Sequence, residues 1–226
     1  MKTCVLFSGG KDSTLALDYA LRFSEVECLV SIASKNPESF MFHTPNMKFV
    51  SAQAESMDLP LIMRETEGVK EEELHDLEKA LREVKGKFSV EGVVTGALAS
   101  AYQASRIQKI CNKLDLECFN PLWQKNQWEL LQELQERKIK AVVAAAFAPG
   151  LKEFLGKPID GKFISGIKKI AEKTGINPAG EGGEFESFTL DAPFFRKRLE
   201  IARSRIVVKG REAAVLEIQE LKGVEK

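Results

Sequence analysis

Six residues near the amino terminus have the types and the spacing of a phosphate-binding loop. They are Ser8, Gly9, Gly10, Lys11, Asp12 and Ser13, and they lie between an apolar run and a helical pattern. The two glycines let the backbone turn sharply and approach a ligand closely. The first turn of the following helix offers free N–H groups and the positive end of its dipole. With two hydroxyls and one ammonium group, this segment is predicted to cradle the phosphates of a nucleotide.

The loop matches neither of two common nucleotide-binding patterns. It lacks the G-x-x-x-x-G-K-[ST] spacing of a Walker A loop and the G-x-G-x-x-G spacing of a Rossmann turn. It resembles the S-G-G-x-D-S loop of the PP-loop, or N-type, ATP pyrophosphatases. In that superfamily the loop holds the β- and γ-phosphates of ATP, which leave together as pyrophosphate. The alternative is a tight turn with a serine cap and no ligand.

Asp12 requires a cation beside it if phosphates bind to this loop, because a carboxylate and a phosphate repel each other. A Mg²⁺ ion that bridges the carboxylate and the phosphate oxygens removes the repulsion, so Asp12 is predicted to be a magnesium ligand. Alternatively, Asp12 only stabilises the amino terminus of the helix through its dipole.

Apolar runs and helical stripes alternate along the first half of the chain. Strands are predicted at residues 2–7, 27–33, 59–64 and 90–95, and helices at 13–23, 47–57, 71–85 and 100–114. This alternation predicts an α/β fold with a doubly wound, mostly parallel sheet. Ligands of such sheets bind beyond the carboxyl ends of the strands. Ser34 and Gly96 follow two strands and are therefore predicted to contact the adenosine, although either could equally be a turn residue.

The pattern changes after residue 120. We predict a nucleotide-binding domain over residues 1–120 and a smaller α+β substrate-binding region over residues 121–226. In this region helices are predicted at residues 126–137 and 163–174, and strands at 140–146, 187–191 and 200–208. An acidic, glycine-rich segment at residues 180–187 suits neither a helix nor a strand. It is typical of a loop that binds a cation or an amine, and otherwise of a solvated turn.

These motifs together resemble the diphthine–ammonia ligase family, a branch of the PP-loop ATP pyrophosphatases with a HUP-like fold. The resemblance covers almost the whole chain, which is similar to the short form of the family without additional C-terminal domains. It departs from the family pattern at residues 177–179, where many relatives carry His or Cys. The residues that carry it are 8–13, 34–37, 41–43, 96–97, 100, 102–106, 111, 121–123 and 180–188.

The resemblance implies the last step of diphthamide synthesis. In that step the carboxylate of a modified histidine on elongation factor 2 becomes an amide, with ATP and ammonia as the other reactants. Attack of the carboxylate on the α-phosphate forms an acyl-adenylate and releases pyrophosphate, and ammonia then displaces AMP. The protein contributes positioning and charge neutralisation. The implied cofactors are ATP and Mg²⁺, and the implied partners are diphthine-bearing elongation factor 2 and ammonium.

The resemblance also implies roles for individual residues. Lys11, Arg106 and Glu184 are expected to be catalytic, with Arg106 holding the substrate carboxylate or neutralising the α-phosphate. Residues 8–13 are expected to bind the nucleotide together with Ser34 and Gly96. The residues expected to contact the substrate are His43, Tyr102, Gln103, Arg106, Glu181, Gly182, Gly183, Glu184 and Glu186. The glutamates of this set would receive the cationic arm of the substrate or an ammonium ion. For Arg106 and His43 the alternatives are a solvated helix charge and a loop histidine without a role.

Composition excludes several other classes of protein. Lys and Arg number 33, as do Asp and Glu, so the formal net charge is zero. No basic excess indicates direct binding to nucleic acid. The longest apolar run, residues 141–148, is far shorter than the ~20 residues that cross a bilayer. With no recognisable signal peptide, the sequence predicts a cytoplasmic protein without a membrane partner.

Three rival functions remain at this level, and one of them is the amidation of a small-molecule carboxylate instead of diphthine. A PP-loop sulfur transferase acting on tRNA would need a reactive cysteine or an iron–sulfur cluster, and Cys111 and Cys118 lack a cluster spacing. A nucleotide-binding protein without catalytic activity would keep the adenosine site alone. The sequence leaves the oligomeric state open, including a homo-oligomer.

Overall fold

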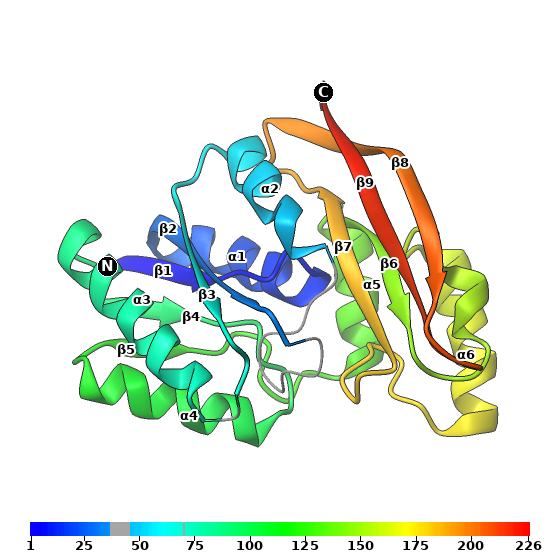
Figure 1. The fold of residues 1–226 in the computed structure, drawn as a ribbon, viewed down its shortest axis with the longest axis horizontal. Coiled ribbons are helices and arrows are strands. Elements are labelled where there is room, and N and C mark those ends of the chain that lie inside the picture. Colours follow the sequence, from blue (N-terminus) through cyan, green and yellow to red (C-terminus); the bar gives the residue numbers. More distant parts are fainter. Residues whose placement is uncertain (37–45, 70) are drawn as a thin grey trace.

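The computed structural model of the chain contains two β-sheets with helices packed around them (Figure 1). It describes residues 1–36, 46–69 and 71–226. The first sheet is parallel and has the strand order β3-β2-β1-β4-β5. Its strands are β1 (Lys2–Leu6), β2 (Glu25–Ser34), β3 (Leu61–Thr66), β4 (Gly92–Val94) and β5 (Glu117–Phe119). This order confirms the predicted doubly wound α/β fold.

Helices cover both faces of the parallel sheet. They are α1 (Lys11–Phe23), α2 (Val50–Met57), which follows the short 3₁₀ turn η1 (Met47–Phe49), α3 (Glu73–Phe88) and α4 (Ala101–Lys113). Buried residues of α1 and α2, such as Leu15 and Ala54, pack in one hydrophobic cluster with Val5 of β1. Buried residues of α3 and α4, such as Leu81 and Ile110, pack in a second cluster on the other face.

The strand order has a switch point between β1 and β4. Val5 of β1 lies opposite Leu29 of β2 on one side and Val94 of β4 on the other. The chain runs outward from β1 in one direction and from β4 in the other, so the connections leave a crevice beyond the carboxyl ends of these two strands. The loop at residues 8–13 follows β1, and Gly96 follows β4. The fold therefore brings these two predicted nucleotide contacts together.

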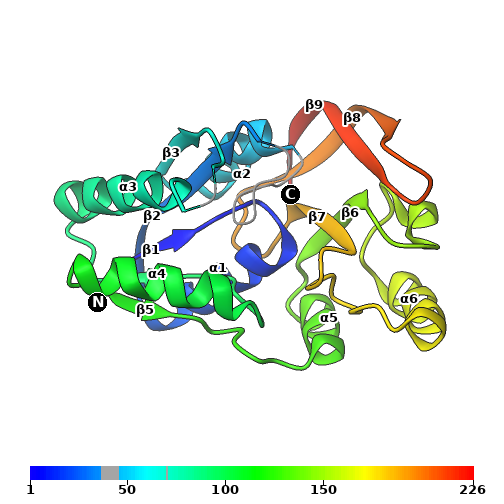
Figure 2. The same cartoon turned by 60° about the horizontal axis from the view of Figure 1, so that its bottom comes forward.

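The second sheet is antiparallel and has the strand order β7-β6-β9-β8. Its strands are β6 (Lys140–Ala146), β7 (Phe185–Asp191), β8 (Lys197–Val208) and β9 (Ala214–Glu225), and the other elements here are α5 (Gln127–Glu136), η2 (Leu151–Phe154) and α6 (Gly161–Thr174). Figure 2 shows α5 and α6 together below β6 and β7. This arrangement confirms the predicted α+β character of the second half. No helix of the described residues is long and apolar enough to cross a membrane.

Side-chain caps explain where several helices begin and end. The Asn126 side chain accepts hydrogen bonds from the first N–H groups of α5, and Asp160 does the same for α6. Gly175 ends α6 with a φ of 72°. Caps of these types satisfy backbone groups that have no partner within a helix.

One hydrophobic cluster extends through both halves of the chain. It joins Leu17 of α1 and Ala54 of α2 to Leu130 of α5, Val143 of β6 and Phe188 of β7. The division at residue 120 is therefore not a break in the core. Whether either half is a separate folding domain stays a prediction.

Candidate functional site

The loop after β1 is a closed turn in which small residues are required. Gly9 has a φ of +79°, and a Cβ at this position would lie 2.3 Å from Oε1 of Gln53. Ser8 N–H donates to Ser13 Oγ at 3.2 Å, and Ser13 Oγ lies 3.1 Å from the Gly10 carbonyl oxygen, to which it donates. Helix α1 therefore begins directly at the turn, where its first N–H groups favour an anion.

Lys11 and Asp12 provide the charges of this loop. The Lys11 side chain is only 4% exposed, and its Nζ donates to Asp12 Oδ2 at 2.8 Å. The same ammonium group lies 5.2 Å from the ring centroid of Phe185. Asp12 Oδ1 is buried and accepts no hydrogen bond from any described residue. An unsatisfied buried carboxylate oxygen is a position that a cation would fill.

A magnesium ion would fit at Asp12 only if the nucleotide supplied further ligands. In the described part of the chain, His, Cys, Asp and Glu side chains form no group of three or more that could hold a metal. Mg²⁺ commonly binds through one or two carboxylates together with substrate phosphates and water. The single orphaned oxygen of Asp12 is compatible with that mode of binding.

A cleft of about 680 Å³ lies at the carboxyl ends of β1 and β4 and is lined by both halves of the chain. Its polar wall includes Ser8, Asp12, Ser13 and Gln103, and its apolar wall includes Leu6, Val30, Ile32, Leu98 and Ile107. The acidic segment contributes Glu181, Gly182, Gly183 and Glu186. A mainly preformed cleft of this size with a few convergent polar groups is typical of a small-molecule site.

Gly96 lines the cleft, but the structure gives a different reason for a glycine there. A Cβ at Gly96 would lie 2.9 Å from the carbonyl carbon of Asp12 and 2.9 Å from the nitrogen of Ser13. The end of β4 therefore packs directly against the backbone of the phosphate-binding loop. The predicted contact between Gly96 and adenosine stays a prediction.

Two glutamates of the acidic segment face the loop across the cleft. Glu181 Oε1 accepts from the Ala99 N–H at 2.9 Å, and burial, reinforced by Asp12, raises the pKa of the Glu181 carboxyl. Burial raises the pKa of Glu186 to about 7, an effect that Lys11 opposes and that Asp12 and Glu181 reinforce. This wall of the cleft therefore favours a cation or a proton.

Glu184 does not line the cleft, unlike its neighbours in the segment. Its Oε1 accepts from the backbone N–H of Asn177 at 2.8 Å and from Asn177 Nδ2 at 2.9 Å, and its Oε2 accepts from Gly182 N–H at 2.8 Å. These contacts favour a role in holding the acidic turn rather than in catalysis. They also give a structural use to Asn177, where the sequence departs from the family pattern.

Tyr102 and Arg106 both contact Glu71, a residue that the sequence analysis did not select. Arg106 donates to Glu71 Oε1 from Nε at 2.9 Å and from Nη2 at 2.5 Å, and Tyr102 Oη donates to the same oxygen at 3.1 Å. The guanidinium carbon lies 3.5 Å from the ring centroid of Tyr102. The hydrogen bond to Glu71 raises the pKa of Arg106. Only Gln103 of this predicted group borders the cleft itself.

Ser34 lies outside the cleft. Ser34 Oγ donates to the Asn36 carbonyl oxygen at 3.0 Å and accepts from the Asn36 N–H at 3.1 Å. These bonds are those of a residue that closes a turn after β2, and Ser34 does not line the cleft. His43 lies outside the described residues, so its predicted role stays a prediction.

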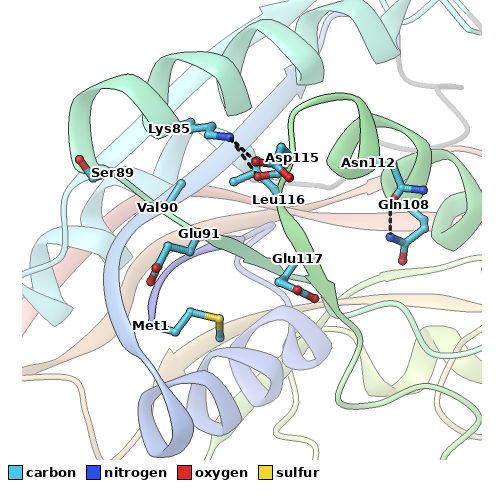
Figure 3. Close-up of a pocket in the computed structure, with 10 residues that line it drawn as sticks. All are labelled: Met1, Lys85, Ser89, Val90, Glu91, Gln108, Asn112, Asp115, Leu116 and Glu117. Carbon is cyan, nitrogen blue, oxygen red and sulfur yellow. Dashed lines mark hydrogen bonds and ion pairs between the residues drawn. The ribbon is translucent and has the colours of Figure 1, made fainter.

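A larger and more open hollow lies at the opposite end of the parallel sheet (Figure 3). It has a volume of about 1040 Å³ and includes Met1, Glu91 and Glu117 at the amino ends of the strands. Lys85 donates there to the carbonyl oxygens of Leu114 and Asp115 at 2.6 and 3.0 Å. None of the residues predicted for the site lines this hollow, and its lysine is used to hold the end of α4.

The cysteines lie away from the cleft. Cys4, Cys28 and Cys111 are buried in the cluster beneath α3 and α4. Burial raises the pKa of the Cys4 and Cys28 thiols, and a hydrogen bond with Cys118 raises that of Cys111. Thiols held in the neutral form are poor nucleophiles. Cys118 differs, because its hydrogen bond with Cys111 lowers its pKa, but it does not line the cleft.

The fold and the cleft define a doubly wound α/β protein with a phosphate-binding loop at its switch point. Two family models match the chain, the diphthamide synthase N-terminal domain over residues 1–118 and the diphthamide synthase C-terminal domain over residues 126–224. The chain belongs to the diphthine–ammonia ligase family.

Curated relatives named diphthine–ammonia ligase extend over nearly the whole chain. The protein from Bos taurus is 33% identical over 94% of this chain and 87% of its own length, and the human protein is 32% identical over the same shares. The Schizosaccharomyces pombe protein is 30% identical over 92% of this chain, which covers 37% of that relative. Among solved structures, a predicted subunit of tRNA methyltransferase from Methanocaldococcus jannaschii is similar to this chain with a TM-score of 0.42 and 15% sequence identity. The match covers 85% of this chain and 98% of that chain. A likeness of this size carries no functional argument.

Proposed function

We propose that this chain is an ATP-dependent, AMP-forming ligase that joins ammonia to the carboxylate of diphthine. The observation that carries the proposal is the cleft between the two halves, in which Asp12 and Ser13 of the loop share the lining with Glu181 and Glu186. Membership of the diphthine–ammonia ligase family supports the same activity.

The phosphate-binding loop and the start of α1 hold the triphosphate of ATP in this proposal. The hydroxyls of Ser8 and Ser13 donate to phosphate oxygens, and the buried Lys11 ammonium neutralises charge that develops on the leaving pyrophosphate. The apolar wall of the cleft receives the nucleoside. Asp12 is the residue that would hold Mg²⁺, which when bound supplies further charge neutralisation at the phosphates.

The acceptor carboxylate and the ammonia approach the cleft from the side of α4 and from the acidic segment. Arg106 already holds one carboxylate, that of Glu71, and its guanidinium is suited to hold that of the substrate. Glu181 and Glu186 line the cleft, and an ammonium ion or the cationic arm of diphthine would favour their charged forms against the burial that raises their pKa values. The protein substrate is diphthine-bearing elongation factor 2, and the reaction takes place in the cytoplasm.

The first test is to identify the products. The whole chain is incubated with α-labelled ATP, Mg²⁺, ammonium and diphthine-bearing elongation factor 2, and the nucleotides are separated. We expect AMP that depends on the protein substrate, and a peptide mass shifted by replacement of a hydroxyl with an amino group. ADP as the product would contradict the PP-loop chemistry, and AMP without peptide conversion would move the proposal to another carboxylate.

A pair of aspartate variants localises the activity. Asp12→Asn removes the charge next to the orphaned oxygen and should lower AMP formation by roughly a hundredfold or more. Asp115→Asn makes the same change at an exposed residue by the opposite end of the sheet and should leave AMP formation intact. Equal rates in the two variants would exclude the cleft as the active site.

A further inference from the structure

One face of β7 lies directly against the phosphate-binding loop. Phe185, Ser187 and Thr189 occupy alternate positions of the strand, so their side chains point to the same side. All three are buried, and the Phe185 ring packs beneath the Lys11 ammonium at 5.2 Å. The second half of the chain therefore forms the floor of the loop.

Ser187 and Thr189 are hydrogen-bonded to two residues of the first turn of α1, Lys11 and Thr14, respectively. Lys11 N–H donates to Ser187 Oγ at 3.0 Å, and the hydroxyls of Thr14 and Thr189 are hydrogen-bonded at 2.9 Å. Thr14 and Thr189 are fully buried, and Ser187 is 4% exposed. Water therefore cannot replace either contact if a hydroxyl is removed.

Gln53 of α2 connects the same two elements from a third direction. Its Nε2 donates to the Gly9 carbonyl oxygen at 2.9 Å and to the Thr189 carbonyl oxygen at 2.7 Å. The Thr189 N–H donates to the Gly9 carbonyl oxygen at 2.9 Å. Gly9 is thus fixed from two sides at the position where its φ is +79°.

Ser187 acts as a helix cap supplied from a distant part of the chain. The residue that precedes α1, Gly10, has no side chain and forms no side-chain cap. A polar side chain at Gly10 would satisfy an N–H of the first turn locally, but a Cβ there would already lie 3.4 Å from both the carbonyl oxygen and Oγ of Ser187, so strand β7 takes that space. Because Ser187 accepts from Lys11 N–H, the turn stays small while this buried donor is satisfied.

We propose that Ser187 is a positioning residue for the ATP loop, with Thr189 as its support. Their hydroxyls hold the segment from Gly9 to Thr14 in the conformation that binds phosphate. This inference rests on the proposed function, because it assumes that the loop binds ATP. It adds that the ATP site is incomplete without the second half of the chain, since β7 also carries Glu186 into the cleft.

The test measures ATP affinity in hydroxyl variants of the whole chain. We expect Ser187→Ala to weaken ATP binding roughly tenfold by calorimetry, because a buried N–H loses its acceptor. Thr189→Val keeps the shape and removes the hydroxyl, and should also weaken binding, whereas Thr189→Ser keeps the hydroxyl and should restore it. In turnover assays the KM for ATP should rise while kcat changes less than about twofold.

Thr3→Val is the matched control. Thr3 is as buried as Thr189, but its hydroxyl bonds Ser24 at the other end of β1. This variant should lower the melting temperature and leave ATP affinity unchanged. If Ser187→Ala and Thr189→Val likewise lose only thermal stability, or if Thr189→Ser binds ATP as weakly as Thr189→Val, the positioning role is wrong. A wild-type chain that binds no ATP would instead overturn the proposed function itself.

Discussion

Arg106 donates from two nitrogens to one oxygen of Glu71 while it stacks on Tyr102, and this geometry distinguishes an arginine from a lysine. The planar guanidinium donates two hydrogen bonds to one carboxylate, which a lysine ammonium cannot reproduce. If Arg106 exchanges Glu71 for the carboxylate of the substrate, the shape of the group matters as much as its charge.

We therefore expect Arg106→Lys to lower kcat/KM for the diphthine substrate roughly thirtyfold, the effect of losing the charge-assisted hydrogen bonds of a planar guanidinium. ATP affinity should not change, because Arg106 does not line the cleft. The measurement is steady-state kinetics with each substrate varied. Arg82→Lys, at an exposed arginine of α3 that pairs with Glu78, is the matched control. A loss confined to ATP binding would place Arg106 at the phosphates instead.

The raised pKa of the Glu186 carboxyl should make the stability of the chain depend on pH. Burial raises the pKa of this carboxyl from 4.5 to about 7. Between these values the folded chain keeps a proton that the unfolded chain has lost, so the free energy of unfolding falls as pH rises through this window. Glu186→Gln removes the effect. In the absence of ATP and Mg²⁺, the melting temperature of this variant minus that of the wild type should increase as the pH rises from about 5 to about 8.

The control for Glu186 is Glu136→Gln on the exposed side of α5, whose melting-temperature difference from the wild type should stay flat. A flat difference for Glu186→Gln as well would show that its carboxyl titrates in its ordinary range.

Sequence reasoning at the residue scale found the groups whose role is encoded by neighbours in the chain. The loop at residues 8–13 combines types and spacing within six positions, so no long-range contact was needed to predict it. Glu71 and Gln53 carry no such local signal, and Ser187 was selected only as the end of the acidic segment, without its contact to the loop. These three act on the site through contacts with residues 35, 44 and 176 positions away, respectively. Only the fold brings these pairs together.

At the scale of elements, the end of β4 determines where the loop can lie. Gly96 touches the backbone of Asp12 and Ser13, and any side chain there would displace the turn. The sequence suggested that Gly96 makes room for adenosine, and the structure adds a second reason for a glycine, the contact with the loop backbone. The two explanations differ in what a methyl group should do.

We expect Gly96→Ala to lower stability by about 1–3 kcal/mol, as overpacking against backbone does, and to weaken ATP binding as well. If Gly96 only accommodates adenosine, ATP affinity should fall with no change in melting temperature. Gly86→Ala is the control, because Gly86 lies in α3 with no atom within 4 Å of the added methyl. That change should stabilise the chain by about 0.5–1 kcal/mol. Thermal denaturation and calorimetry distinguish these outcomes.

The elements that sequence reasoning missed are those stabilised by pairing rather than by a long apolar pattern. Strand β5 has only three residues and is recognisable only beside β4. Strand β9 buries Ala214, Leu216 and Ile218 at alternate positions, but its second half is exposed and is held by the ladder to β8. Helix α3 begins at Glu73 rather than at 71, because Glu71 has a φ of 69°.

At the scale of the whole molecule, the two halves share both a core and a charged network. Tyr19 Oη donates to Glu133 Oε1 at 2.6 Å, and Arg137 Nη1 donates to Asp18 Oδ2 at 2.5 Å. These contacts join α1 to α5 beside the hydrophobic cluster that extends from β1 to β9. We infer that the chain unfolds as one cooperative unit, although its family models divide it between residues 118 and 126.

The fragment of residues 1–120 tests this inference. Removal of residues 121–226 would expose the apolar side of α1 and α2, including Leu17 and Ala54, and would remove the Ser187 cap from the loop. We expect the fragment to show no cooperative thermal transition and no ATP binding.

The whole chain should give the same melting curve by two probes. Far-ultraviolet circular dichroism reports on both halves, whereas tryptophan fluorescence reports on the second half, because both tryptophans, Trp123 and Trp128, lie there. Addition of the fragment of residues 121–226 should restore ATP binding if the two pieces reassociate. A fragment of residues 1–120 that melts cooperatively and binds ATP as tightly as the whole chain would show that the first half is a complete domain with a self-sufficient loop.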